Sequence, residues 1–186
     1  HEGRTGASTI NIVSVRERGY EATEEEIKEI YKTKSDIFNG LPKAKRMPGA
    51  LEVLTQIKEN GLTPMVVTGS GQLSLLDKLN HNFPNIFQEH LMVTAFDVKY
   101  GKPNPEPYLM ALKKAGINAN QAIVVENAPL GVQAGVAAGI FTVAVNTGPL
   151  PDSALLEQGA NLLFHSMNEF SENWKNLFNA LNQTTR

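Results

Sequence analysis

Three short segments of the sequence hold the residues most able to do chemistry. They are Thr68, Gly69 and Ser70 in "VVTGS", Lys102 in "GKPNP", and Glu126 and Asn127 in "VVENA". A hydroxyl-rich turn at a helix start is a natural seat for phosphate, because it offers hydroxyls and free N–H groups. The lysine supplies a fixed positive charge, and the acid and the amide supply the hard oxygen ligands that Mg²⁺ requires. Together they match what phosphoryl transfer needs, which is charge neutralisation, positioning and a metal ion.

Each segment also has a purely structural interpretation. The prolines around Lys102 make that segment a stiff lead-in to a helix, which turn chemistry explains without a ligand. The Thr68-Gly69-Ser70 turn could be a helix N-cap, and Glu126 could cap the helix that follows it. Glu126 is the stronger indication of a site, because an acid at the end of an apolar strand must find a partner when it is buried. The three segments in this order are more specific than any one of them.

Helices alternate with short apolar strands from Met47 onward, and this pattern predicts an α/β core. We expect helices over 48–60, 71–79, 106–116, 130–139, 152–159 and 167–181. We expect strands over 63–68, 122–126, 141–146 and 161–164, and a short strand within 91–96. The alternation is typical of right-handed βαβ crossovers and a Rossmann-like parallel sheet with helices on both faces. Ligands of such sheets bind beyond the carboxyl ends of the strands. We therefore expect the three segments to converge on one rim.

The N-terminal part of the chain differs from this core and is predicted to be a small helical unit. Its first helix ends at Gly19, which is a typical C-cap. Its second helix opens with Thr23 and Glu26, which form the pattern of a capping box. A linker rich in glycine, proline and lysine follows. We therefore expect a helical domain over 1–46 and the α/β core over 47–186.

Composition and charge limit the partners that this chain can have. Seventeen basic and nineteen acidic residues give a formal net charge of −2, so no basic face for nucleic acid is expected. No apolar run approaches the ~20 residues that cross a bilayer. The absence of cysteine fits a reducing compartment. We expect a cytoplasmic monomer or weak dimer that acts on a small molecule and binds neither nucleic acid nor membrane.

The order of the three segments, with "APLGVQAGVAAG" after the third, resembles the haloacid dehalogenase superfamily of phosphatases and phosphomutases. The resemblance is closest to the β-phosphoglucomutase-like branch, which carries a small α-helical cap. It implies that residues 1–46 belong to the cap and 47–186 to the core. It also implies the roles of the site residues: phosphoryl binding by Thr68, Gly69 and Ser70, charge balance by Lys102, and Mg²⁺ binding by Glu126 and Asn127.

Two departures from the family pattern matter. The family's first motif is an apolar strand that ends in Asp-x-Asp and supplies the nucleophile and the general acid/base, and no segment matches it. Asp36 and Asp97 lie in other contexts. The resemblance therefore implies that the first core strand and the nucleophile lie in an N-terminal segment absent from this sequence. The second departure is Asn127, where many relatives have an acid. The lost negative charge favours a compact, charge-dense substrate.

The opening hexapeptide, "HEGRTG", is the remaining candidate for substrate contact. In relatives, the cap loop at this place faces the leaving group and sets specificity. Arg4 can bind phosphate oxygens through its planar fork, and Glu2 could hold the metal or a metal-bound water. The structural alternative is that both residues are solvated at a helix start. The hexapeptide is most similar to a branch that includes inorganic pyrophosphatases.

These patterns leave three functions open. The first is a Mg²⁺-dependent phosphohydrolase that acts on inorganic pyrophosphate or on a small phosphate ester. The second is a β-phosphoglucomutase, which transfers a phosphoryl group on a hexose phosphate. The third is a catalytically inactive binding domain of the same fold, whose only support is the unmatched first motif. An Asp-x-Asp sequence upstream in the full-length gene would remove the third.

Overall fold

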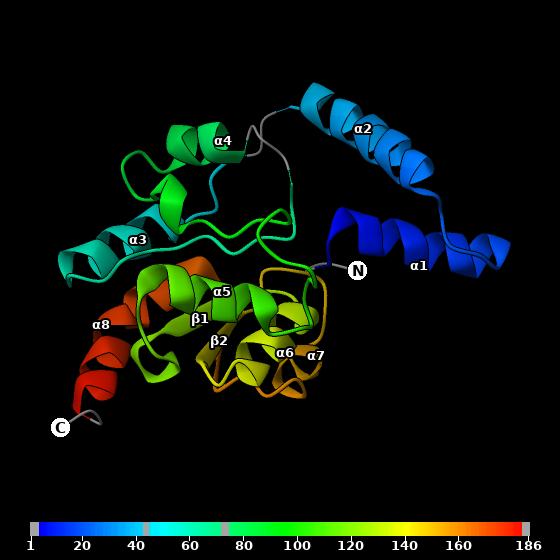
Figure 1. Cartoon of the computed structure of the whole chain (residues 1–186). Coiled ribbons are helices and arrows are strands. Elements are labelled where there is room, and N and C mark those ends of the chain that lie inside the picture. Colours follow the sequence, from blue (N-terminus) through cyan, green and yellow to red (C-terminus); the bar gives the residue numbers. More distant parts are fainter. Residues whose placement is uncertain (1–3, 43–44, 72–74, 184–186) are drawn as a thin grey trace.

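The computed structural model describes residues 4–42, 45–71 and 75–183. Two helices, α1 (Gly6–Arg18) and α2 (Glu24–Gly40), pack against each other and stand to one side of an α/β body (Figure 1). Their ends form as the sequence predicts. Gly19 ends α1 with a left-handed φ of 82°, and Thr23 and Glu26 complete the capping box of α2. The boundary between two domains near residue 46 stays a prediction.

A parallel sheet lies at the centre of the body. Its strands are β1 (Ile123–Glu126), β2 (Phe141–Val145) and β3 (Leu162–Phe164), in the spatial order β1-β2-β3. Helix α6 (Pro129–Ala137) connects the first two strands, and α7 (Ser153–Leu156) connects the last two. The predicted parallel α/β architecture is therefore confirmed.

Two predicted strands do not form. Residues 63–68 and 91–96 are joined only by one parallel bridge between Val67 and Val93. Two backbone hydrogen bonds accompany it, from the Thr68 N–H to the Val93 carbonyl (2.9 Å) and from the Val93 N–H to the Val66 carbonyl (2.8 Å). The Val67 carbonyl accepts from the Lys102 ammonium (3.1 Å). Apolar residues favour a strand, but a stable ladder needs partners along its length.

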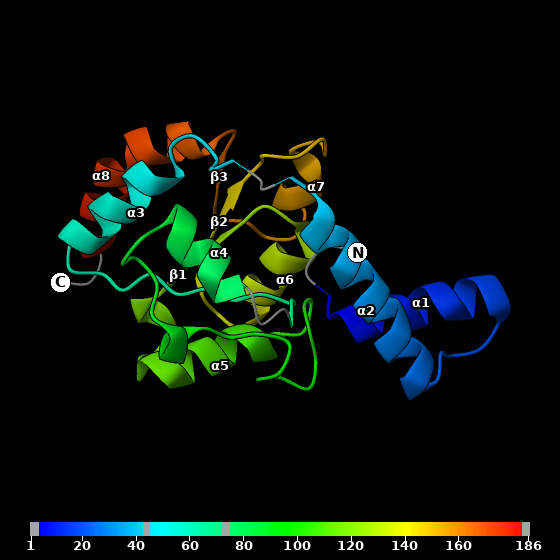
Figure 2. The same cartoon turned by 90° about the horizontal axis from the view of Figure 1, so that it is seen from above.

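Helices cover both faces of the sheet. The last helix, α8 (Met167–Gln183), lies beside α3 (Ala50–Glu59), as Figure 2 shows. Their apolar residues share a core with β2, and the fully buried members of this core are Val53, Val143, Val145, Phe170, Trp174 and Leu177. A second core joins β1 to α5 (Glu106–Ala115) and α6 through Tyr108, Val124, Ala134, Ala138 and Ile140. These two cores fix the carboxyl edge of the sheet in place.

The remaining elements are short. Helix α4 (Leu75–Asn82) and the 3-10 turns η1 (Glu89–Leu91) and η2 (Ala119–Gln121) connect the larger elements. In the part of the chain that the structure describes, no helix is both long and apolar enough to cross a membrane.

A histidine is held between two carboxylates where β3 ends. The Nε2 atom of His165 lies 3.0 Å from an oxygen of Asp152, and its Nδ1 atom lies 3.3 Å from an oxygen of Glu169. The hydrogen bond with Asp152, followed by the charge of Asp152 and the hydrogen bond with Glu169, raises the pKa of His165 above its ordinary value of 6.5. When it is protonated, the histidine links Asp152, directly before α7, to Glu169 in the first turn of α8.

This linkage predicts a pH-dependent contribution to stability. Because the pKa of His165 is raised by folding, its stabilisation is fully present below about pH 6.5 and is lost as the pH rises through the raised value. The melting temperature of wild type should therefore exceed that of His165→Gln at about pH 5.5, and the difference should shrink by about pH 8.5. His90→Gln, at an exposed histidine elsewhere, should keep the wild-type pH dependence. A constant difference between wild type and His165→Gln across this range would contradict the linkage.

Candidate active site at the carboxyl edge of the sheet

Lys102 is buried, with only 6% of its side chain exposed. Its ammonium donates to the Val67 carbonyl at 3.1 Å and pairs with Oε1 of Glu126. It also lies over the ring of Tyr108, 4.9 Å from the ring centroid. A buried ammonium requires such partners, because taking the charge out of water costs several kcal/mol. Lys102 and Glu126, which the sequence analysis predicted for one site, are therefore in contact.

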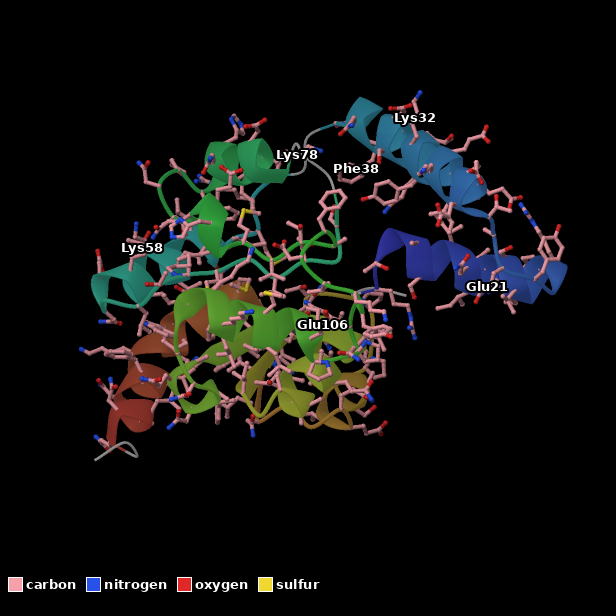
Figure 3. The ribbon with its side chains drawn as sticks, viewed as in Figure 1. Glu21, Lys32, Phe38, Lys58, Lys78 and Glu106 are labelled. Atoms are coloured by element: carbon pink, nitrogen blue, oxygen red, sulfur yellow. The ribbon has the colours of Figure 1, made fainter. Side chains whose placement is uncertain are left out.

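The segment that carries Lys102 is fastened to the start of α5. Both carboxylate oxygens of Glu106 accept backbone N–H groups, from Lys99 at 2.9 Å and from Tyr100 at 2.8 Å. The Asn104 side chain accepts the Glu106 N–H at 2.9 Å. Figure 3 labels Glu106 at this end of α5. The side chains of Glu106 and Asn104, as well as the prolines, therefore fix the conformation of the segment that positions Lys102.

Glu126 ends β1, and its carboxylate is 10% exposed. Its Oε1 atom accepts the Tyr108 hydroxyl at 2.6 Å as well as the Lys102 ammonium. Its Oε2 atom accepts the N–H of Asn127 at 3.2 Å. Burial, and then the charge of Glu126, raise the pKa of Tyr108 far above its ordinary value, so the phenol remains a donor. The carboxylate is therefore oriented by donors on both of its oxygens.

Helix α6 leaves room for this carboxylate. A Cβ atom added at Gly131 would lie only 2.1 Å from the Glu126 carboxyl carbon. Gly131 is in the first turn of α6, where the positive end of the helix dipole stabilises a negative charge. A side chain at position 131 would therefore displace the Glu126 carboxylate from the position that it has here.

The predicted phosphate turn follows directly on the Val67 carbonyl that binds Lys102. The Ser70 N–H donates to the Thr68 hydroxyl oxygen at 3.1 Å, and Gly69 lies between them. Residues 69–71 are not helical, so Thr68 itself does not cap a helix. The expectation that the turn lies at a helix start stays a prediction, because residues 72–74 lie outside the described part of the chain.

The helical pair α1–α2 reaches the core next to these segments. The Gly71 N–H donates to the Tyr31 hydroxyl of α2 at 3.0 Å. The chain before α1 packs on Gly101, where an added Cβ atom would lie 2.9 Å from the Thr5 backbone nitrogen. Farther along α2, Lys78 of α4 lies over the ring of Phe38, 4.6 Å from its centroid, and Figure 3 shows the two side chains facing each other. Two of these three contacts adjoin the site.

A cavity of about 440 Å³ opens between the chain start and the Lys102 segment. Among the residues that the structure describes, its lining contains two cations and no carboxylate, and consists of Arg4, Thr5, Ser8, Lys99, Tyr100, Gly101, Pro103 and Asn104. The Nε atom of Arg4 is buried and has no hydrogen-bond partner within the described part of the chain. The cavity is therefore suited to an anionic group. Glu2, the other candidate in the opening hexapeptide, lies outside the described residues.

Glu126 and Asn127 could supply part of the ligand set of one magnesium ion. The described residues contain no cluster of three or more His, Asp or Glu side chains that could hold a metal. Mg²⁺ is nevertheless commonly bound by one or two carboxylates, with water and substrate phosphate completing its shell. Glu126 offers such a carboxylate, and the exposed Asn127 follows it directly. Their roles as metal ligands stay a prediction.

Sequence reasoning missed Tyr108, Tyr31 and Lys99. Both tyrosines lie in helices at positions that apolar residues also occupy, so their spacing indicates packing rather than a polar contact. Lys99 is one of many exposed lysines. Only the folded chain brings these three residues to the predicted ones.

The space at Gly131 gives a direct test of the site geometry. Alanine in a helix interior normally stabilises by about 1 kcal/mol relative to glycine. Gly131→Ala should instead lower the free energy of unfolding by about 1–3 kcal/mol, because the new methyl group displaces the Glu126 carboxylate. Chemical denaturation measures this. Gly40→Ala, at a helical glycine with open space around it, should be neutral or slightly stabilising. An unchanged free energy for Gly131→Ala would contradict the geometry.

The sequence of the chain is similar to those of known phosphatases. The chain is 33% identical to hexitol phosphatase A of Escherichia coli over 125 residues, which are 67% of this chain and 56% of that protein. It is 32% identical to the phosphorylated carbohydrates phosphatase of Thermotoga maritima over 135 residues, 72% of this chain and 61% of that protein. The chain thus spans less than two thirds of the length of either phosphatase.

A solved structure is more similar still. A Bacteroides vulgatus protein assigned provisionally as a β-phosphoglucomutase is 76% identical, with a TM-score of 0.93, over 97% of this chain and 73% of that one. The family model of haloacid dehalogenase-like hydrolases matches residues 4–145, which contain Arg4, the Thr68 turn, Lys102 and Glu126. This match, over more than half of the sequence and all of the site, shows that the chain belongs to the haloacid dehalogenase-like hydrolase family.

Proposed function

We propose that the protein is a Mg²⁺-dependent phosphatase for a small phosphorylated substrate. The observation that carries the proposal is the buried pair of Lys102 and Glu126 beside the Thr68 turn, at the carboxyl edge of a parallel sheet. Ligands of such sheets bind at this edge. The similarity to two phosphatases of phosphorylated carbohydrates supports the substrate class.

Each residue has a role that follows from its position. The Lys102 ammonium neutralises negative charge on the phosphoryl oxygens, and the Thr68 hydroxyl donates to one of them. The stiff segment before α5 fixes the ammonium, so little reorganisation is required during reaction. Glu126, with Asn127, would hold Mg²⁺, which supplies further neutralisation of the phosphoryl charge when it is bound. Ser70 and Gly69 complete the turn around the phosphoryl group.

The nucleophile is the part of the proposal that the described residues do not supply. Asp97 is engaged by the N–H and hydroxyl of Thr94 and by Lys114 at 2.7 Å, so it has a structural role. Asp36 is exposed on α2. In the family to which the chain belongs, an aspartate of the first motif is the nucleophile, and we propose that such an aspartate, outside the given residues, attacks the phosphoryl group. An upstream sequence without one would favour the inactive binding domain.

The substrate of the proposed phosphatase has two candidates, and a mutase reaction is a third possibility. The cation-lined cavity at Arg4 and Lys99 favours a substrate with a second anionic group, such as inorganic pyrophosphate. The named relatives favour a carbohydrate or polyol phosphate. A β-phosphoglucomutase is the third candidate, supported by the Bacteroides vulgatus structure.

Steady-state rates of the full-length protein on pyrophosphate, hexitol phosphates and β-glucose 1-phosphate would separate these substrates. Phosphate release from any of them supports a phosphatase. Isomerisation of the glucose phosphate without phosphate release would support the mutase. No turnover of any of them would contradict the proposed activity.

Replacement of the central lysine tests the proposal for catalysis. Lys102→Met should lower kcat/KM by at least about 100-fold, because a buried charge that stabilises the transition state is worth about 3 kcal/mol or more. Steady-state assays of the full-length variant measure this. Lys114→Met removes another partly buried, ion-paired lysine and should leave the rate within about 2-fold. A Lys102→Met enzyme with half of the wild-type rate would rule out the assigned role.

Replacement of Arg4 tests the cavity. Arg4→Ala should lower kcat/KM for pyrophosphate by about 10–100-fold, because a charge-assisted contact of about 1.5–3 kcal/mol is lost. Hydrolysis of an aryl phosphate should change much less, since its leaving group carries no second phosphate. Arg16→Ala, at an exposed arginine of α1, is the matched control and should change neither rate. Equal losses on both substrates would show that Arg4 does not discriminate between them.

A further inference from the structure

The hydroxyl of Tyr108 is placed as a second support of the Glu126 carboxylate. Tyr108 lies in the first turns of α5 and is 6% exposed. Its hydroxyl donates to Oε1 of Glu126 at 2.6 Å, across the contact between α5 and the end of β1. A buried phenol normally requires a partner, and here the partner is the proposed metal ligand.

The two oxygens of this carboxylate are used unequally. Oε1 accepts both the Tyr108 hydroxyl and the Lys102 ammonium. Oε2 accepts the backbone N–H of Asn127 at 3.2 Å. A carboxylate oxygen has two lone-pair sites, so Oε1 is filled by its two donors, while Oε2 has a free site as far as the described residues show. The arrangement reserves one particular oxygen for a cation.

The ring and the hydroxyl of Tyr108 have separable roles. The ring packs in the core with Val124, Ala134 and Ile140, and it also lies beneath the Lys102 ammonium. Phenylalanine would fill the same space and keep both contacts. Only the contact with Oε1 would be lost, so the hydroxyl can be tested without removing the core residue.

We propose that Tyr108 is a positioning residue for magnesium binding, whose hydroxyl holds Oε1 of Glu126 so that Oε2 is presented to the ion. The proposal rests on the proposed function, because that function assigns Mg²⁺ to Glu126. Without the hydroxyl, Lys102 is the one side chain left on Oε1, and the carboxylate is free to turn toward it. The ammonium then competes with the metal for the same group.

The test is the Mg²⁺ affinity of the full-length Tyr108→Phe protein, measured by calorimetry without substrate. Loss of a hydrogen bond behind a metal ligand typically weakens metal binding by about 10–100-fold. We expect a Kd about 10-fold above that of wild type, and the same factor in the Mg²⁺ concentration for half-maximal activity. At saturating Mg²⁺, kcat should recover most of its wild-type value. Tyr20→Phe, at an exposed tyrosine of the α1–α2 pair, should bind Mg²⁺ as wild type does.

A second measurement needs no metal. Tyr108→Phe, Glu126→Gln and the double variant form a mutant cycle in the free energy of unfolding. If the hydroxyl contacts the carboxylate, the two single effects should be non-additive. Additive effects, or a wild-type Kd for Tyr108→Phe, would overturn the inference.

Failure of the proposed function gives a different result. If Glu126→Gln binds Mg²⁺ as tightly as wild type, the metal assignment itself is wrong, whatever Tyr108→Phe shows. If Glu126→Gln loses the metal while Tyr108→Phe binds it normally, the metal assignment holds and only the role of Tyr108 is wrong.

Discussion

The buried ion pair of Lys102 and Glu126 is the constraint on which the site depends. Two charges that are taken out of water destabilise a fold unless each gains further partners. Here the lysine gains the Val67 carbonyl and the face of Tyr108, and the glutamate gains the Tyr108 hydroxyl and the Asn127 N–H. The sheet, the helix that follows β1 and the helix that follows Lys102 must therefore meet at one point. Phosphoryl transfer requires the same meeting of opposite charges.

The α1–α2 pair contacts the core at the Thr68 turn and at the segment that carries Lys102. Tyr31 accepts the Gly71 N–H just beyond the Thr68 turn, and Thr5 packs on Gly101 just before Lys102. A movement of the helical pair would therefore disturb both segments that are proposed to contact the phosphoryl group. The cation-lined cavity lies at the second of these contacts, so the proposed substrate selection would depend on residues that also hold the helical pair in place.

The sequence predicted the residues that lie at the carboxyl ends of strands and at helix caps. Lys102, Glu126 and the Thr68 turn come together because parallel strands and their lead-in segments share one edge, and polar residues after apolar runs mark that edge. Residues 63–68 and 91–96 were predicted as strands from their apolar residues, but a ladder depends on distant partners that local sequence does not encode. Tyr108 and Tyr31 escaped notice because a tyrosine on an apolar helical face has the spacing of a core residue. The role of Gly131 follows only from the space that Glu126 occupies.

The most direct test of this account is a crystal structure of the full-length protein with Mg²⁺ and phosphate. The account predicts that a Glu126 oxygen lies about 2.1 Å from the metal. It also predicts that the Lys102 ammonium and the Thr68 hydroxyl lie within hydrogen-bond distance of the phosphate, about 3 Å. Mg²⁺ bound away from Glu126, with the phosphate out of reach of Lys102, would contradict it.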